Sequence, residues 1–295
     1  MACKIAVVGP GALGSLFSVM LSHAGHKVTL VDHREDRANR LSAQGIRLID
    51  HGTGRETHAK PALALTIPTG QDFILVCTKS YSTASLRFPP ETPLLTLQNG
   101  LTNVDVLCQM VGSARVMAGT TSEGACLIEE GKVAHTGRGK TVFGAWTSCD
   151  CSTAYKALAE AGFHVELTEA PGQAIWEKVT VNAGINPLTA LLNVPNGRLL
   201  EIREARELMR DLVVEAAKVA ATEGYRFQHS LVELAEEVCR QTAANISSML
   251  QDIRAGRQTE IDAISGEILR RAQVAGLPTP RTRVIWQLVT ALEKR

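Results

Sequence analysis

The chain has 295 residues, which is enough for one large domain or two domains of ordinary size. Apolar residues make up 45% and charged residues 21%, a composition that excludes intrinsic disorder and fibrous repeats. Lysine and arginine total 31 against 30 aspartates and glutamates, so no excess positive charge is present to grip nucleic acid or an anionic membrane.

The cysteines and histidines suggest no structural cross-link. Seven cysteines, an odd number, are scattered along the chain, which favours reduced thiols and a cytoplasmic protein over a disulfide framework. Cys149 and Cys151 lack CxxC spacing and the histidines lack HxxxH spacing, so we predict no metal site. Apolar runs all fall short of the roughly 18 residues of a membrane span, and we expect neither a membrane nor a nucleic acid as partner.

The start of the chain predicts a strand, a turn, a helix and a second strand. Residues 4–8 (KIAVV) are typical of a buried strand, residues 12–24 keep a helical period, and residues 28–31 form a second apolar run. This βαβ pattern predicts an α/β fold of the Rossmann type. A GxGxxG motif lies where the first strand becomes the helix, and its residues are Gly9, Pro10, Gly11, Ala12, Leu13 and Gly14.

Each glycine of the motif has a physical role. Gly9 allows the tight turn, Gly11 lets a pyrophosphate approach the backbone, and Gly14 lets helix and strand pack closely. We therefore predict dinucleotide binding at the positive end of the helix. The alternative is a glycine-rich turn that binds nothing.

The residues after the second strand bear on which dinucleotide binds. Asp32 indicates NAD, because a carboxylate there accepts the ribose hydroxyls, whereas His33, Arg34 and Arg37 could hold the 2′-phosphate of NADP. A third interpretation is a solvated helix start that Asp32 merely caps. The residues themselves leave these three interpretations open.

Polar residues also follow two further predicted strands, residues 72–77 and 93–97. Ligands gather at the carboxyl ends of strands in an open α/β sheet, so Lys79 and Asn99 are candidates to line the cofactor site. For Asn99 with Gly100, a simple turn dipeptide is the alternative.

The rest of the first half predicts more sheet. Residues 115–146 suggest antiparallel strands that extend the sheet, with hairpin turns at 130–132 and 137–139. A helix is expected over residues 152–161 and a last strand over 163–167.

Helical periods dominate the second half, for instance residues 205–223, 231–240 and 260–275. We predict a dinucleotide-binding domain over residues 1–169 and an all-helical domain over 170–295, with the active site in a cleft between them. The long helices could pack internally or across a two-fold axis, so a homodimer is left open.

One helix of the second half carries a polar stripe. In residues 173–192, Lys178, Asn182 and Asn186 follow one another at i, i+4 and i+8 and share a face. Because the helix is apolar almost all round, these side chains are expected to converge on something polar. The alternative is a ladder of hydrogen bonds between helices.

Later residues add further candidates. Asn245 and Ser248, expected one helical turn apart, could offer an amide and a hydroxyl to a substrate carboxylate, or could cap a helix. Thr259 is expected to cap a helix that begins at Glu260, where a carboxylate is favourable in any case.

Several motifs together resemble the ketopantoate reductase (2-dehydropantoate 2-reductase) family over the whole chain and in the right order. They are GPGALG at 9–14, QNG at 98–100, WEK at 176–178, VNAGINPLTA at 181–190, NG at 196–197, NISSMLQD at 245–252 and TEID at 259–262.

The resemblance implies NADPH-dependent reduction of 2-dehydropantoate to pantoate, a small-molecule reaction on the route to coenzyme A. It implies that Lys178 is the general acid and that Asn99 touches both ligands. It also assigns the substrate to Asn182, Asn186, Asn196 and Ser248, and places Lys79, Ala125 and Glu260 near the cofactor, with Glu260 available to support the lysine.

Two alternatives and one departure accompany this assignment. Asp32-His33-Arg34 stands where many relatives have an arginine without the carboxylate, so NAD is retained as an alternative to NADP. A related reductase of another small 2-oxo acid could keep Lys178 and the asparagines. A non-catalytic NADP(H)-binding sensor would need the glycine motif but not the lysine.

Overall fold

The computed structural model describes residues 2–295, and internal contacts divide the chain into two units. The first unit comprises residues up to Gln98 together with Asn103–Ala174, and the second comprises Asn99–Thr102 together with Ile175–Arg295. The short segment Asn99–Thr102 therefore leaves the first unit and groups with the helices of the second.

An eight-stranded sheet forms the centre of the first unit, in the order β12-β11-β8-β7-β6-β1-β2-β5. All neighbours pair in parallel except β8 and β11. The βαβ start and the strands predicted at 72–77, 93–97 and 163–167 are confirmed. The strands are β1 (Lys4–Val8), β2 (Lys27–Val31), β5 (Ala62–Ala64), β6 (Phe73–Val76), β7 (Leu94–Thr96), β8 (Val116–Thr121), β11 (Lys140–Ala145) and β12 (His164–Leu167).

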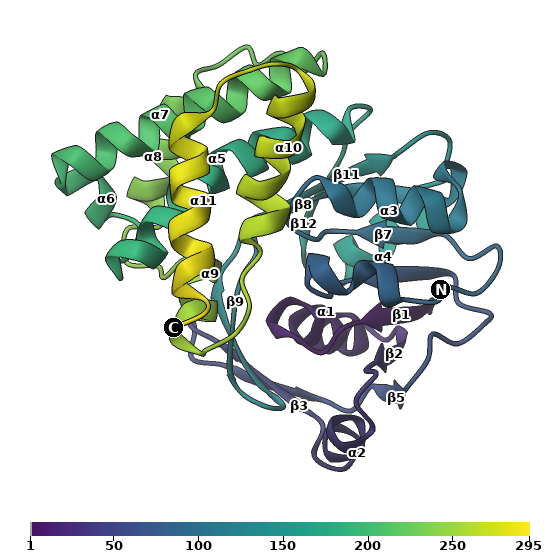
Figure 1. Cartoon of the computed structure of the whole chain (residues 1–295). Helices are drawn as coiled ribbons and strands as arrows, with labels where there is room; N and C mark the ends of the chain where they lie inside the picture. Colours follow the sequence, from purple (N-terminus) through teal and green to yellow (C-terminus); the bar gives the residue numbers. More distant parts are fainter. Residues whose placement is uncertain (1) are drawn as a thin grey trace. The chain divides into compact units, whose positions relative to one another are not determined.

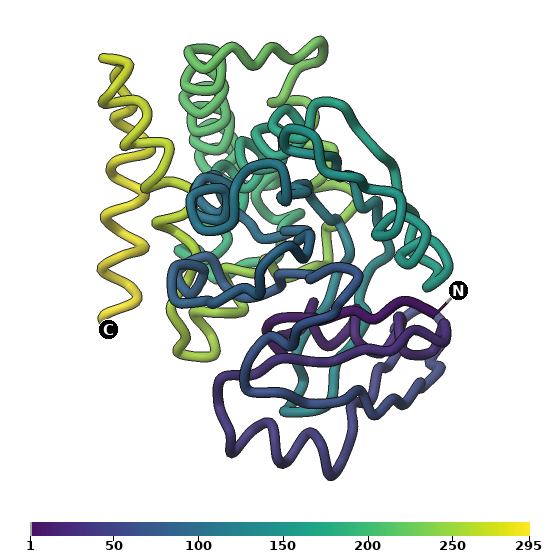
Figure 2. Tube along the Cα trace, turned by 90° about the vertical axis from the view of Figure 1, so that its right-hand side faces the viewer, coloured from purple at the N-terminus to yellow at the C-terminus, as the bar shows by residue number. Residues whose placement is uncertain are grey.

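Helices pack on this sheet and complete an α/β layer structure (Figure 1). Leu16 and Phe17 of the first helix are fully buried, and the ring of Phe17 lies 4.6 Å from that of Phe163. In Figure 2 the purple trace follows the succession of β1, the first helix and β2. The helices and 3-10 turns are α1 (Ala12–His23), α2 (Glu35–Gln44), η1 (Ser80–Ser85), α3 (Thr102–Val111), η2 (Ser113–Arg115) and α4 (Ser152–Glu160).

A second sheet of four strands corrects the prediction that the strands of residues 115–146 all extend the first sheet, because β9 and β10 of this segment belong to the second sheet. Its order is β4-β3-β10-β9, with β3 (Ile46–Asp50), β4 (Glu56–Ala59), β9 (Gly124–Glu129) and β10 (Lys132–Gly137). The hairpin turn expected at 130–132 is confirmed, because β9 and β10 pair around Gly131 at a φ of +78°.

The predicted hairpin turn at 137–139 is wrong. β10 and β11 do not pair with each other, and β11 pairs instead with β8. The chain bends from one sheet to the other here, beside the bend that joins β8 to β9. A Cβ at Gly139 would lie 2.5 Å from the carbonyl oxygen of Ser122, so the glycine permits a close passage of two segments rather than a reversal.

The second unit is helical, as the periodicity predicts. Its core includes Leu199, Met209, Val213 and Cys239, all without exposed surface. No helix within residues 2–295 is both long enough and apolar enough to cross a membrane. The helices are α5 (Pro171–Leu192), α6 (Arg198–Glu201), α7 (Arg203–Thr222), α8 (Leu231–Gln241), α9 (Ser248–Arg254), α10 (Glu267–Val274) and α11 (Pro280–Leu292), with a π-helical turn η3 (Asp262–Gly266) before α10.

Candidate active site

The glycine motif forms a turn that only glycines permit. Gly9 follows β1 with a φ of +102°, and its amide donates a hydrogen bond to the carbonyl oxygen of Val31 at 3.0 Å. A Cβ at Gly14 would lie 1.9 Å from the Gly9 carbonyl oxygen. The loop is thereby held between the ends of β1 and β2, with α1 packed tightly against it.

The space in front of this turn is open at Gly11. A Cβ placed on Gly11 would meet no atom of the described chain within 4 Å. Gly11 is the residue before α1, it offers no side chain to the first amides, and the first turn of α1 contains no acidic residue. Free amides, open space and the positive end of a helix are what a phosphate group requires.

Lys79 lies directly after β6, as predicted, and its side chain is partly exposed. The neighbouring ends of β6 and β7 are tied together by Gln98, whose Nε2 donates to the carbonyl oxygen of Thr78 at 2.8 Å and to Oγ1 of Thr83 at 2.9 Å. Ala125 belongs to β9 of the second sheet and is partly exposed.

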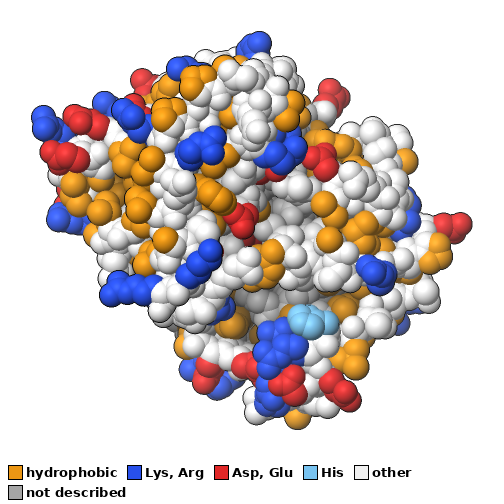
Figure 3. Space-filling view, in the orientation of Figure 1, with side chains coloured by type: hydrophobic (Ala, Val, Ile, Leu, Met, Phe, Trp, Pro, Cys, Tyr) orange, Lys and Arg blue, Asp and Glu red, His pale blue; other side chains and the backbone are white. Residues whose placement is uncertain are grey.

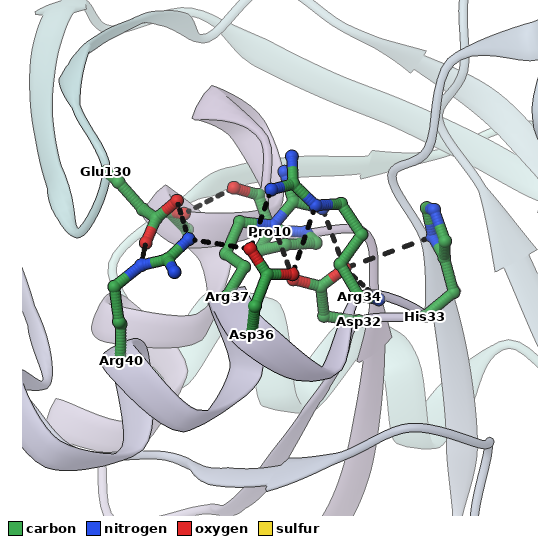
Figure 4. A network of polar contacts seen from close by, with 9 residues as sticks. Pro10, Asp32, His33, Arg34, Asp36, Arg37, Arg40 and Glu130 are labelled. Carbon is green, nitrogen blue, oxygen red and sulfur yellow. Dashed lines mark hydrogen bonds and ion pairs between the residues drawn. The ribbon is translucent and has the colours of Figure 1, made fainter.

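A network of ion pairs follows β2 (Figure 4). Asp32 is buried and Arg37 donates to both of its carboxylate oxygens, with 2.7 Å between Nη2 and Oδ1. Arg34, at the surface, donates from Nη2 to Asp36 at 2.9 Å. Of the open interpretations of Asp32, the structure shows a carboxylate that is ion-paired within the chain and also accepts the Arg34 amide at 3.1 Å.

In the helical unit, α5 carries Lys178, Asn182 and Asn186. The start of this part of the helix is fixed by Trp176, which is buried and donates from Nε1 to Glu223 at 3.3 Å. The Arg271 guanidinium lies 5.7 Å from the centre of the Trp176 ring and also binds Glu223 at 2.6 Å. Lys178 is thus two residues from a rigid anchor.

Lys178, Glu260 and Asn99 form the electrostatic centre of the site. Lys178 is half-buried, and the desolvation of its ammonium group lowers its pKa from 10.5 to about 8, while the negative charge of Glu260 acts in the opposite direction. Glu260 is buried, and its Oε2 accepts a hydrogen bond from Asn99 Nδ2 at 3.1 Å. Three residues that are far apart in the sequence are therefore brought together within the second unit.

The QNG turn reaches Glu260 through a close backbone approach. Gly100 has a φ of +96°, and a Cβ there would lie 2.7 Å from the carbonyl oxygen of Ala263 in η3. Gly100 therefore adopts the positive φ of a turn, and Asn99 binds Glu260, while the place of Asn99 beside a cofactor stays a prediction. Thr259 Oγ1 accepts from the Ile261 amide at 3.1 Å, but the helical turn η3 begins at Asp262 without a side-chain cap, so the prediction that Thr259 caps a helix beginning at Glu260 is wrong.

Asn186 on α5 and Asn196 after it are buried. Asn196 Nδ2 donates to Thr242 Oγ1 at 2.9 Å, and its backbone amide donates to the carbonyl oxygen of Asn245 at 3.0 Å. Asn196 Oδ1 is buried and has no hydrogen-bond partner within residues 2–295. A buried amide oxygen without a partner is unusual, and a substrate hydroxyl would satisfy it.

The expected spacing of Asn245 and Ser248 on one helix is wrong. Asn245 lies in the loop before α9, and Ser247 is the residue that caps this helix by accepting the Leu250 amide at 3.1 Å. Asn245 and Ser248 are both exposed, so neither is used as the cap. The prediction of a shared helix face is wrong because Ser247 caps α9, so the helix begins at Ser248 and Asn245 lies before it.

Supporting residues escaped the sequence analysis. Thr189 on α5 and Ser247 share a hydrogen bond of 2.7 Å between their hydroxyls, which ties α5 to the start of α9. Thr242 supports Asn196 in the same way. Small hydroxyl residues carry no distinctive pattern, and only their position beside the candidate motifs could have indicated them.

A Rossmann-type glycine turn and a lysine beside a carboxylate are features expected of a reductase of the Rossmann-fold class. Groups of three or more histidine, cysteine or acidic side chains arranged to hold a metal are absent from residues 2–295. The models of the ketopantoate reductase PanE/ApbA family match residues 5–148, and for its C-terminal part residues 172–293. The chain belongs to the ketopantoate reductase family, a family of oxidoreductases.

Individual relatives agree with this assignment. The chain is 36% identical to the 2-dehydropantoate 2-reductase of Halobacterium salinarum over 99% of both proteins. A PanE/ApbA family ketopantoate reductase from Ralstonia eutropha superimposes with a TM-score of 0.88 at 29% identity, over 99% of this chain and 98% of that one. D-mandelate dehydrogenase in complex with NADH and anilino(oxo)acetate superimposes with a TM-score of 0.91 at 29% identity and the same coverage.

Proposed function

We propose that the protein reduces 2-dehydropantoate to pantoate with NADPH as the hydride donor, a step on the route to coenzyme A. The observation that carries this proposal is Lys178, whose pKa of about 8 is set by burial against the charge of Glu260. The glycine turn with open space at Gly11 supports a dinucleotide as the second reactant. Membership of the ketopantoate reductase family supports the choice of substrate.

Lys178 is assigned the role of the general acid that protonates the substrate oxygen. A dinucleotide held at the glycine turn would supply the hydride for the ketone carbon, which would leave negative charge on the carbonyl oxygen. A Lys178 ammonium at that oxygen would stabilise the charge and donate the proton, an effect of roughly 10² to 10⁴ in rate. A pKa near 8 keeps the group protonated at neutral pH and still able to release its proton.

Glu260 and Asn99 would keep this acid ready. The carboxylate favours the protonated lysine, so Lys178 regains its proton between turnovers. Asn99 holds Glu260 through the bond at 3.1 Å. In line with the family resemblance, we assign two roles to Glu260 and Asn99: they support the protonated Lys178, and they contact the cofactor.

The remaining polar residues would bind the two ligands. Amide and hydroxyl groups do not titrate near neutral pH, and they suit the hydroxyl and carboxylate of the substrate. Asn182, Asn186, Asn196, Asn245 and Ser248 are proposed for the substrate. Gly9, Pro10, Gly11, Ala12, Leu13, Gly14, Asp32, Arg34, Lys79 and Ala125 are proposed for the dinucleotide.

A second candidate is a reductase of another 2-oxo acid. The high structural similarity to D-mandelate dehydrogenase favours it, because that protein shares nearly the whole fold. Such an enzyme could keep Lys178 and the asparagines and differ only in the residues around the substrate side chain.

Initial rates decide between the two candidates. NADPH and NADH oxidation would be followed at 340 nm with 2-dehydropantoate, with the 2-oxo acid that corresponds to mandelate, and with straight-chain 2-oxo acids. The proposal predicts the highest kcat/KM for 2-dehydropantoate with NADPH. A higher kcat/KM with another 2-oxo acid would establish the second candidate instead.

A further inference from the structure

The carboxylate of Asp32 is fully enclosed by its own chain. Its side chain has 0% exposure, while that of Arg37 has 23%. Arg37 donates from Nε to Oδ2 and from Nη2 to Oδ1, so both oxygens face one guanidinium. This two-pronged geometry is the strongest arrangement between arginine and a carboxylate.

This ion pair limits the ability of the Asp32 carboxylate to accept hydrogen bonds from a dinucleotide. A carboxylate at the end of the second strand of a Rossmann fold binds the ribose hydroxyls of NAD, and its charge repels a 2′-phosphate. Here the hydroxyls would compete with Arg37 for both oxygens. The charge that would repel a phosphate is at the same time neutralised.

Two further arginines and two further carboxylates surround this ion pair, and none of them contacts both oxygens of Asp32 as Arg37 does. Arg34 and Arg40 share Asp36 and hold the pKa of this carboxyl well below its ordinary value, and Arg40 also binds Glu130 at 2.6 Å. With Asp32 and Arg37, the network contains three arginines and three carboxylates, joined at its edge by the exposed His33 (Figure 4). In Figure 3 basic and acidic side chains alternate at the surface over the region of α2.

We infer that Arg37 is a specificity-determining residue, because its ion pair with Asp32 masks the carboxylate and so biases the glycine turn toward a dinucleotide with a 2′-phosphate. The inference rests on the dinucleotide binding of the proposed function. It assigns to Arg37 an effect exerted through Asp32, whereas a direct contact of Arg37 with the phosphate would act without Asp32.

The test is the ratio of the Kd for NADH to the Kd for NADPH, measured by nucleotide fluorescence without any oxo acid. Wild-type protein should bind NADPH more tightly. Arg37→Gln keeps hydrogen-bond donors but loses the charge, and it should lower the ratio at least about tenfold by exposing Asp32 as an acceptor and as a repelling charge. Arg37→Lys keeps the charge but cannot cover both carboxylate oxygens, so it should lower the ratio less than Arg37→Gln does.

Two further variants separate masking from other roles. Arg40→Gln removes the same charge from the same helix without touching Asp32, and should change the ratio less than about twofold. In an Asp32→Asn background, Arg37→Gln should no longer lower the ratio, because no carboxylate is left to unmask.

Three outcomes would overturn the inference. They are equal weakening of both dinucleotides in Arg37→Gln, the same fall of the ratio in the Asp32→Asn background, and tighter binding of NADH than NADPH by the wild type. The last does not depend on a stable Arg37→Gln single variant, in which a buried Asp32 would be left unpaired, and the second can be read as any fall of the ratio from Asp32→Asn to the double variant. Because no oxo acid is present, a protein that fails to reduce 2-dehydropantoate can still confirm or overturn the inference.

Discussion

At the scale of single residues, the chemistry rests on how the protein sets the charge of Lys178. Burial lowers its pKa and Glu260 raises it, and the two effects leave a value of about 8. The sequence could place the lysine on a helix face with two asparagines, but it could not supply this value. The opposing carboxylate lies 82 positions along the chain, and only the fold brings it near.

The pH dependence of the reaction follows from this balance. Reduction needs the protonated lysine, so kcat should be level at low pH and fall as pH rises through about 8. In Glu260→Gln the charge that raises the lysine pKa is removed, so the fall should begin at lower pH. Rates of NADPH oxidation measured from pH 5.5 to pH 10 would show this, and an unchanged profile in Glu260→Gln would contradict the role of the carboxylate.

Arg34 should favour the phosphorylated dinucleotide. Its guanidinium is exposed, and its ion pair with Asp36 at the surface is weak enough to be exchanged for one with a 2′-phosphate. We expect Arg34→Ala to weaken NADPH binding more than NADH binding, because a phosphate loses a charge-assisted partner that a hydroxyl does not need. Fluorescence titration with both nucleotides measures the two losses, and equal losses would assign the preference to Asp32.

At the scale of elements, the periodicity of the sequence predicts most helices and the central strands. It could not predict β3 and β4, because they are short, partly exposed strands that pair with each other and join a separate sheet through the distant strand β10. The bend at 137–139 has the glycines of a hairpin turn, and the local sequence does not distinguish a hairpin turn from a bend between two sheets. β11 pairs with β8 instead of β10 because β10 belongs to the second sheet, and this long-range pairing is not encoded in the local sequence.

The glycine turn offers a matched pair of variants. Gly11→Ala adds a methyl group in open space, so stability should change little while the affinity for NADPH falls at least about tenfold, since the methyl would occupy the place of the pyrophosphate. Gly14→Ala places a Cβ 1.9 Å from the Gly9 carbonyl oxygen and should cost roughly 1–3 kcal/mol of stability or more. Urea unfolding and nucleotide titration would report both effects. Unchanged NADPH affinity in Gly11→Ala would contradict the assignment of this space.

At the scale of the whole molecule, the predicted domain boundary between residues 169 and 170 follows the change from strands to helices. The internal contacts add to the helical unit a segment that the prediction left in the first domain. Asn99–Thr102 belongs with the helical unit because Gly100 packs on Ala263 and Asn99 binds Glu260. The glutamate and the asparagine are separated by 161 positions, a contact that no local pattern encodes. The candidate site was therefore predictable as a set of residues and not as an arrangement.

Binding of the dinucleotide should stabilise the folded protein by mass action. NADPH at about 100 times its Kd should contribute about 2.7 kcal/mol, which corresponds to a rise in Tm of roughly 5–10 °C for a unit of this size. NADH at the same concentration should raise the Tm less. Thermal unfolding followed by circular dichroism tests this, and the absence of any shift with millimolar NADPH would contradict dinucleotide binding.

The most direct test compares wild type with Lys178→Ala, using 2-dehydropantoate and NADPH. We expect kcat to fall at least about 100-fold while the Kd for NADPH changes only a few-fold, because the variant removes the proton donor and leaves the glycine turn intact. Near-full activity of the variant would contradict the central claim, since another group would then have to protonate the reduced ketone.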